Sequence, residues 1–330
     1  MRISYIHSII LVAAVYCCML CGCAHEPDIV LKTRTCASLP AGGRASACVC
    51  ALDGKAYVFS GRDANGKYKR DLWQYDPATD TWTQLSSCPG KARVKAVMVA
   101  HDGALYAGLG FSGEQVYVDS CYLRDLWRYT PSNNQWTKLS DCPYANTVSG
   151  VPYVKNNRLY VLYCGGWSHS NDIIYYDFEA DKWDCIPDSG KRIEACFAPT
   201  GAECDGRFFF GTGVAWKSQR IWYEVDVDAD TWTRRASIPC RGRELCASCA
   251  TDNYVYLFGG RTFAGDLTGG EVFAEYMRYN VAIDKWEYCG NMPCGKCENM
   301  IAFTINNTAY FGLGEDEKGI TLNNLYCIEK

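Results

Sequence analysis

The sequence predicts an all-β fold, a six-bladed β-propeller, and three observations lead to this prediction. Tryptophans recur about 50 residues apart in similar sequence frames. Between them, an aromatic residue followed by a glycine recurs in register. Finally, the 330 residues include 23 tyrosines, 10 tryptophans and 30 glycines, a composition that favours many short strands joined by tight turns.

The tryptophan repeat predicts the outer half of each blade. Each copy ends a segment in which alternating aromatic residues form a strand and a cluster of Asp, Pro or Asn forms a turn. The five copies are Trp82, Trp136, Trp183, Trp232 and Trp286. Because they repeat with the scaffold, we interpret them as packing groups between blades rather than as ligand contacts.

The aromatic–glycine repeat predicts the inner half and occurs six times. Its copies are Tyr57/Gly61, Tyr106/Gly110, Tyr160/Gly165, Phe209/Gly213, Tyr256/Gly260 and Tyr310/Gly314. The third copy carries one extra residue. The sixth repeat lacks its last strand at the C-terminus, and residues 31–40 resemble the stretch that begins at Trp82. We therefore predict that the N-terminal strand completes the last four-stranded blade and removes the open edges of the ring.

The aromatic-x-x-x-Gly, Tyr-Asp-Pro and Trp elements, in this order, resemble the kelch motif over about residues 30–330. The resemblance implies blades whose strands run a, b, c, d outward from the axis. The b–c loops and the d–a connections then share one face. The b–c loops after Gly110 and Gly260 are the longest, in blades 2 and 5. Because function concentrates on loops held by a rigid scaffold, we expect this face to be the working face.

Arginines recur on the expected working face, either before strand a or after the glycine of strand b. They are Arg44, Arg62, Arg93, Arg192, Arg243 and Arg261. Several guanidinium groups on one rim would favour a carboxylate or phosphate ligand. The kelch resemblance also implies contacts to acidic peptides at this rim. In the alternative interpretation, the arginines before strand a are scaffold residues that bond to neighbouring loop carbonyls, and the sequence supports both equally.

Aromatic residues beside these arginines fit either a glycan site or packing within the loops. The candidates are Trp167, His169, Trp216 and Phe263. We expect a binding module that takes a glycan, an acidic sugar or a protein partner through the b–c loop face. The alternative is a mutarotase or epimerase acting on N-acetylneuraminate or a related acidic sugar. This follows from similarity to sialic acid mutarotases, exported kelch-like propellers of about this size. In that case Glu315 and Glu194 are the candidate acid and base.

We expect neither a metal nor another cofactor. A copper oxidase site is disfavoured because His101 and His169 are predicted on opposite faces. Two Cys-x-x-Cys pairs, at 246/249 and 294/297, lack the separation of a zinc ribbon or finger. Of the 21 cysteines, 17 remain after the expected signal peptide and lipidated residue, and they fit one or two disulfides between adjacent blades in an oxidising compartment, although the pairing does not follow from the sequence.

The N-terminus predicts export and lipid anchoring. A short apolar stretch, residues 9–20, precedes Leu20-Cys21-Gly22-Cys23, which resembles the bacterial lipobox. Residues 1–22 would be the signal peptide, Cys23 the lipidated residue and 23–29 a tether, with the propeller at 30–330. We expect a monomer in the cell envelope, anchored to the outer membrane. A net charge of −4 gives no indication of nucleic-acid binding.

Overall fold

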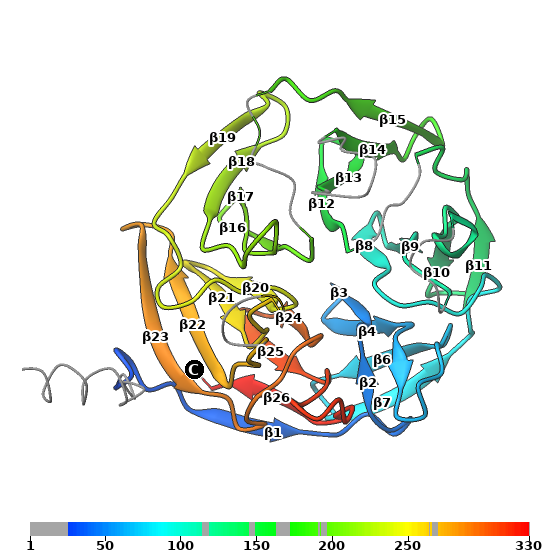
Figure 1. The fold of residues 1–330 in the computed structure, drawn as a ribbon. Coiled ribbons are helices and arrows are strands. Elements are labelled where there is room, and N and C mark those ends of the chain that lie inside the picture. The colour runs from blue at the N-terminus through cyan, green and yellow to red at the C-terminus, as the bar shows by residue number, and fades with distance from the viewer. Residues whose placement is uncertain are drawn as a thin grey trace, which may run out of the picture.

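Six four-stranded antiparallel sheets surround a central axis in the computed structural model (Figure 1). It describes residues 26–113, 119–144, 149–162, 172–190, 192, 197–263, 265 and 270–329. The innermost strand of each sheet contacts the innermost strands of both flanking sheets, so the ring is closed. The predicted six-bladed propeller is therefore confirmed.

Strands follow the chain order from the axis outward in five of the blades. Blades 1 to 3 are β3 (Cys48–Leu52), β4 (Lys55–Phe59), β6 (Leu72–Asp76), β7 (Thr81–Leu85); β8 (Val97–His101), β9 (Ala104–Gly108), β10 (Leu126–Thr130), β11 (Gln135–Lys138); and β12 (Val151–Lys155), β13 (Arg158–Leu162), β14 (Ile173–Asp177), β15 (Lys182–Ile186). Blades 4 and 5 are β16 (Thr200–Cys204), β17 (Arg207–Gly211), β18 (Trp222–Asp226), β19 (Thr231–Arg234); and β20 (Ala247–Thr251), β21 (Tyr254–Phe258), β22 (Glu275–Asn280), β23 (Lys285–Asn291). A short pair, β2 (Arg44–Ala45) with β5 (Arg62–Asp63), and a 3₁₀ turn, η1 (Asp119–Cys121), complete the elements outside blade 6.

Blade 6 joins the two ends of the chain. It consists of β24 (Ile301–Ile305), β25 (Thr308–Gly312), β26 (Leu325–Ile328) and the N-terminal strand β1 (Thr33–Cys36). β1 pairs antiparallel with β26, from Thr33 opposite Ile328 to Cys36 opposite Leu325. Figure 1 shows the blue β1 lying outside the red β26. The predicted closure is confirmed, and it covers an apolar strand edge that would otherwise be open.

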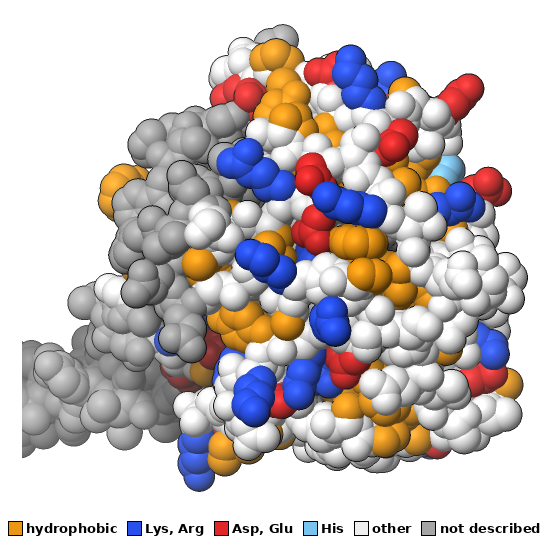
Figure 2. Space-filling view, turned by 90° about the vertical axis from the view of Figure 1, so that its right-hand side faces the viewer, with side chains coloured by type: hydrophobic (Ala, Val, Ile, Leu, Met, Phe, Trp, Pro, Cys, Tyr) orange, Lys and Arg blue, Asp and Glu red, His pale blue; other side chains and the backbone are white. Residues whose placement is uncertain are grey.

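The second strand of each blade is buried on both faces because a blade packs against it from either side. In β17, Phe208, Phe209 and Phe210 are all buried. Such a strand has no solvent face, which explains its continuous apolar run. The outermost strands β7, β11 and β19 are half-exposed and largely polar. At the edge of the disc, Figure 2 shows charges of both signs between small hydrophobic patches.

A repeated clamp joins neighbouring blades. The Tyr75 hydroxyl donates a hydrogen bond to Asp80 at 2.6 Å, and Asp80 also accepts the Ala37 N–H of the neighbouring blade at 2.8 Å. Trp82 donates to the Ala37 carbonyl at 2.8 Å. Equivalent bonds join Trp136 to Ser86, Trp183 to Ser140 and Trp286 to Ala236. The interpretation of the repeated tryptophans as packing groups between blades is thus confirmed for these four.

The a–b turns are tight hairpins on the face opposite the b–c loops. Asp53 and Gly54 have φ values of 50° and 74°, and four further turns share this two-residue left-handed geometry. It is the type I′ turn, which Asp, Asn and Gly favour. In the part of the chain that the structure describes, none of the helices has the length and apolar character needed to cross a membrane.

Candidate functional site

Six residues with left-handed backbone, one per blade, surround the axis where the inner strands begin. They are Ser46, Lys95, Ser149, Ala198, Leu245 and Asn299, with φ between 50° and 58°. The N–H of Lys95 donates to the carbonyl of Ser46 at 2.9 Å, Ser46 donates to Asn299 at 3.0 Å, and Asn299 donates to Leu245 at 3.0 Å. These hydrogen bonds run from blade to blade around the axis, and we call the six residues the axial ring.

A cavity of 350 Å³ opens on the b–c loop face of the axial ring, and we call it the funnel. Beyond five members of the axial ring, its lining residues are Arg62, Tyr68, Val94, Phe111, Tyr122, Phe197 and Glu244. On the other side of the ring, a channel of 620 Å³ runs between the inner strands. The funnel has the volume of a small-ligand site and faces the loops expected to carry function.

The rim of the funnel has an apolar part and a charged part. Short β-bridges between the d–a connection and the b–c loop form the rim in blades 1, 2, 4, 5 and 6. In blades 2 and 4 the bridged pairs are apolar, Val94 with Phe111 and Phe197 with Val214. In blades 5 and 6 they are charged, Glu244 with Arg261 and Glu298 with Glu315. Phe197 is 45% exposed, so its ring is available to a ligand.

Ion pairs between blades organise the charged part. Arg62 of blade 1 pairs with Glu315 of blade 6, whose other oxygen accepts a hydrogen bond from the Asn299 side chain at 2.7 Å. Arg261 of blade 5 pairs with Glu298 at 3.3 Å. Arginines from both flanking blades therefore hold the two blade 6 carboxylates at fixed positions.

Lys95 is the only charged member of the axial ring. Its ammonium makes no hydrogen bond or ion pair with any described residue, although Glu244, Glu298 and Glu315 act on it electrostatically. Burial lowers the pKa of Lys95, and these three carboxylates oppose the shift. An ammonium that lines a cavity without a hydrogen-bond partner can donate to an oxygen of an incoming ligand.

Glu298 is a buried carboxylate in the blade 6 part of the rim. Burial raises its pKa, and the nearby carboxylates Glu315 and Glu244 act in the same direction while Arg261 opposes them. Its Oε2 atom has no hydrogen-bond partner within the described residues. Because the raised pKa favours the protonated form, Glu298 can donate as well as accept a proton.

The arginines before strand a lie inside the scaffold in blades 1, 2 and 5. Arg44, Arg93 and Arg243 are at most 1% exposed. Arg44 pairs with Asp71 at 2.7 Å, Arg93 with Asp125 at 2.6 Å, and Arg243 with Glu275. Each also donates to a loop carbonyl, as Arg44 does to Ser60 at 2.8 Å. The structure thus favours the scaffold interpretation for these three side chains.

The other predicted site residues are spread over different locations. Arg192 is buried against Asp230 at 2.8 Å, whereas Arg62 and Arg261 reach the funnel rim. Trp216 is 91% exposed and Phe263 is 37% exposed, both on b–c loops. Glu194, Trp167, His169 and the lipidation residue Cys23 lie outside the described residues. The structure therefore brings together Arg62, Arg261 and Glu315 of the predicted set.

Sequence reasoning did not select Lys95, Glu244, Glu298 or Phe197 as site residues. The available signal was their register relative to the repeated arginines. Ser46, Lys95 and Leu245 each follow Arg44, Arg93 or Arg243 by two positions. Because the arginine side chain points into the scaffold, the side chains of neighbouring residues in the chain point to the funnel.

The fold and the rim define a class, a propeller of kelch repeats with a ligand-sized funnel on its b–c loop face. The chain belongs to the kelch-repeat family. The profile of the KLHDC2/KLHL20/DRC7 Kelch-repeats domain matches residues 30–213, and that of the Kelch motif matches residues 242–293.

Among individual proteins, the chain is similar both to kelch-like proteins and to sugar epimerases. It is 28% identical over 70% of its length to Kelch-like protein 35 of Mus musculus, and 26% identical over 73% to N-acetylneuraminate epimerase of Haemophilus influenzae. It spans 37% and 58%, respectively, of the lengths of these relatives. The solved structure of YjhT shares the fold, with a TM-score of 0.72 and 16% identity over 88% of this chain and 96% of that one.

The buried arginine–carboxylate pairs predict acid sensitivity. We expect Asp125→Asn to lower the free energy of unfolding by about 3 kcal/mol at pH 7, because it leaves Arg93 buried without its counter-charge. Burial tends to raise the pKa of Asp125, but hydrogen bonds and charge from Arg93, with Trp127, lower it overall. The contribution is therefore present above pH ~4 and is lost as the pH falls through the depressed pKa.

Denaturant unfolding at pH 7 and at pH 3 measures this effect. The difference between the variant and the wild type should shrink at the lower pH. Asp141→Asn is the control because Asp141 pairs with Lys138 where both side chains are more than half exposed, and it should leave stability close to wild type. Equal losses for the two variants would contradict the assignment of Arg93 to the scaffold.

Proposed function

We propose that the propeller is a binding module for a glycan, which enters the funnel on the b–c loop face. The division of the funnel rim into an aromatic part and a charged part is the observation that carries this proposal. A sugar ring has an apolar face and a periphery of hydroxyl groups, so it needs surfaces of both kinds close together. The 350 Å³ funnel provides them around one cavity.

The aromatic part would take the apolar face of a sugar. Phe111 and Phe197 belong to the bridged pairs of blades 2 and 4, and Tyr68 and Tyr122 also line the cavity. Phe111 and Tyr122 pack edge to face, with ring centroids 5.3 Å apart. This contact fixes the Phe111 ring, whereas Phe197 is exposed to solvent. Rigid aromatic surfaces supply contact area with little loss of side-chain freedom on binding.

The charged part would take the hydroxyl, amide or acid groups of the sugar. Lys95 offers three donors at the base of the funnel, and Glu244 offers acceptors on its wall. Arg62 and Arg261 are held by Glu315 and Glu298, so they are fixed in place before a ligand arrives. Fixed polar groups determine which arrangement of sugar hydroxyl groups fits.

Glycan binding can be tested on an array of neutral, sialylated and sulfated oligosaccharides. We expect Phe197→Ala and Lys95→Met each to weaken the binding of the best glycan by at least about tenfold, since each removes one of the two kinds of contact. Titration calorimetry with that glycan measures the change. Lys91→Met is the matched control because Lys91 is an exposed lysine four residues earlier.

Trp216→Ala distinguishes binding in the funnel from binding on the outer loops. Loss of binding through Trp216 alone, with Phe197→Ala unaffected, would contradict a funnel site and would favour a protein partner on the loops. Binding of no glycan, with a folded protein of normal melting temperature, would remove the proposal.

A second candidate is mutarotation of a free acidic sugar, and Glu298 is the observation that favours it. A protonated Glu298 would donate to the ring oxygen as the ring C–O bond breaks, while Glu315, held by Arg62 and Asn299, would accept the proton of the anomeric hydroxyl group. Ring opening and reclosure on the other face would exchange the anomers with no net loss of a proton. Relatives named N-acetylneuraminate epimerase support testing this sugar first.

The test is the rate of anomer exchange of N-acetylneuraminate, followed by NMR. If the candidate is correct, Glu298→Gln should lower the rate about 100-fold or more, because it removes the transferable proton but keeps the shape. Arg44 and Arg243 are unsuitable as variants because they stabilise the scaffold. A wild-type rate equal to the uncatalysed rate would exclude this activity.

We further propose that Cys23 carries a lipid that holds the propeller on the outer membrane of the cell envelope. The lipobox-like residues 20–23 support this proposal. Cys23→Ala should release the chain from the membrane fraction, because the variant lacks the residue that carries the lipid. Membrane fractionation and mass spectrometry of the N-terminal peptide measure the change. Continued retention of the variant would argue against the anchor.

A further inference from the structure

Blade 6 differs from blades 1, 2 and 5 at the position of the buried arginine. The carbonyl groups of Arg93 and Arg243 accept the N–H of Gly61 and Gly213 of other blades, and Cys297 accepts Gly260 in the same way. Cys297 therefore occupies the register of the arginine in blade 6. The acid that pairs with the arginine lies at the start of the third strand in those three blades, and Asn324 occupies this register in blade 6. Both members of the ion pair are thus replaced together.

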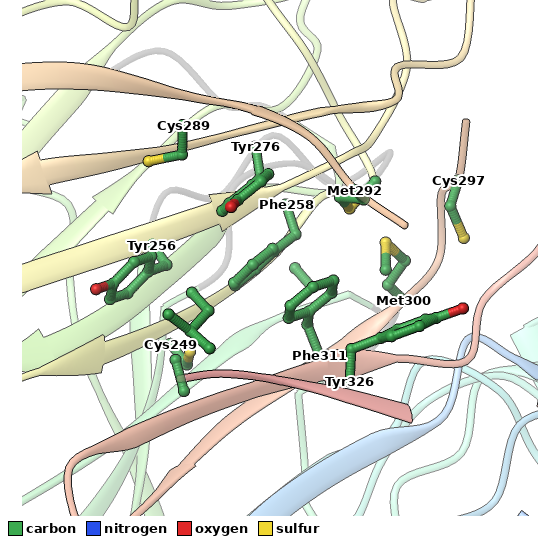
Figure 3. Close-up of a cluster of buried hydrophobic side chains, with 13 residues drawn as sticks. Cys249, Tyr256, Phe258, Tyr276, Cys289, Met292, Cys297, Met300, Phe311 and Tyr326 are labelled. Atoms are coloured by element: carbon green, nitrogen blue, oxygen red, sulfur yellow. The ribbon is translucent and has the colours of Figure 1, made fainter. Parts of the chain in front are cut away.

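A second thiol lies next to Cys297. Cys294 is three residues earlier, and a turn at Gly295, with φ of 74° and a 3.0 Å hydrogen bond from its N–H to the Met292 carbonyl, joins the two. The two side chains interact closely enough that each thiol shifts the pKa of the other. Cys294 is partly exposed, whereas Cys297 is fully buried. Figure 3 shows Cys297 beside Met300 at one end of the hydrophobic cluster.

The two thiols have different reactivity. The interaction with Cys297 lowers the pKa of Cys294, which favours its thiolate. The same contact and burial raise the pKa of Cys297. The accessible sulfur is therefore the nucleophile and the buried sulfur is the resolving partner. Among the described residues there is no cluster of three metal-binding side chains, so a zinc site lacks the ligands it needs.

The other Cys-x-x-Cys pair shows that spacing alone does not create this arrangement. Cys246 and Cys249 lie at and just inside the start of strand β20, where positions three apart point to opposite faces. Cys246 packs against the cluster shared with blade 4, and Cys249 belongs to the cluster shared with blade 6. These two thiols are therefore separated by the strand itself.

We propose that Cys294 and Cys297 are a thiol–disulfide exchange site, which is oxidised by a disulfide substrate and reduced by a dithiol. The Cys294 thiolate attacks one sulfur of the substrate disulfide and releases one thiol. Cys297 then loses its proton and attacks Cys294, which forms the internal disulfide and releases the second thiol. Two protein thiols are oxidised and one disulfide is reduced to two thiols, so electrons and protons balance.

The exchange site adjoins the funnel. Cys297 directly precedes Glu298, and its thiol donates to the Leu313 carbonyl at 3.4 Å, next to Gly314. Oxidation removes this donor and ties the d–a connection of blade 6 through a short covalent loop. The proposal does not depend on the ligand of the funnel.

The experiment incubates the folded chain in oxidised and reduced glutathione at defined ratios, then blocks free thiols by alkylation and digests with trypsin. Cleavage after Lys296 separates Cys294 from Cys297, so an internal disulfide keeps two peptides together until reductant is added. We expect these linked peptides under oxidising ratios and their loss under reducing ratios. Cys294 should also be alkylated at least ~10-fold faster than Cys246 or Cys249 in the native chain.

Two variants complete the test. Cys297→Ser should trap glutathione on Cys294 as a mixed disulfide, whereas Cys294→Ser should block both products. The double variant Cys246→Ser/Cys249→Ser is the matched control and should leave the linked peptides unchanged. If Cys297→Ser lowers the melting temperature, Cys294→Ser at the partly exposed position still decides the order of attack, because a mixed disulfide of glutathione with Cys297 in that variant would contradict the proposed order. Thiols that stay reduced at every ratio, or a disulfide that resists reductant, would overturn the proposal.

Discussion

The blade-to-blade hydrogen bonds of the axial ring are the constraint on which the funnel depends. They form because a left-handed residue precedes each inner strand, and in blades 1, 2, 5 and 6 its N–H donates to the neighbouring blade. Lysine, leucine and alanine occupy this conformation at some cost in backbone energy. The cost is met by the outer clamps, in which Asp80 and its counterparts join a tyrosine hydroxyl to the next blade. Inner and outer bonds together fix the radius at which the rim side chains stand.

Side chains in the d–a connection that forms the rim perform two different tasks. Side chains that point into the scaffold, such as Arg93, hold the d–a connection to the start of the third strand. Side chains two positions later, such as Lys95, face the cavity. Blade 6 keeps the backbone pattern but uses thiols in place of the ion pair. The scaffold therefore tolerates different chemistry at the inward position, provided that the carbonyl of that residue still accepts the glycine N–H.

The fold could be predicted from the sequence because its determinants repeat. The aromatic–glycine pairs recur in all six blades, and both the tryptophans and the Asp53-Gly54 type of turn recur in five, so period and register define the blades. The site could be predicted only in part. Arg62, Arg261 and Glu315 do reach the rim, but the direction in which Arg44 and Arg93 point depends on an acid 27 and 32 residues away, respectively, in another loop. No sequence repeat indicated that Lys95 is a site residue, because the equivalent residue differs from lysine in every other blade.

Scaffold-facing and cavity-facing positions are separate, so the residues around the cavity can vary in different combinations. Six equivalent sites stand around one axis, and each can be exchanged without disturbing the side chain that secures its own blade. An exchange of the apolar pair of blade 4 for that of blade 2 alters one sector of the rim, whereas a change of Arg261 in blade 5 also affects Glu298 of blade 6. Kelch propellers of the same architecture could in this way diverge in specificity by small, local substitutions, sector by sector, while the ring that supports them stays constant.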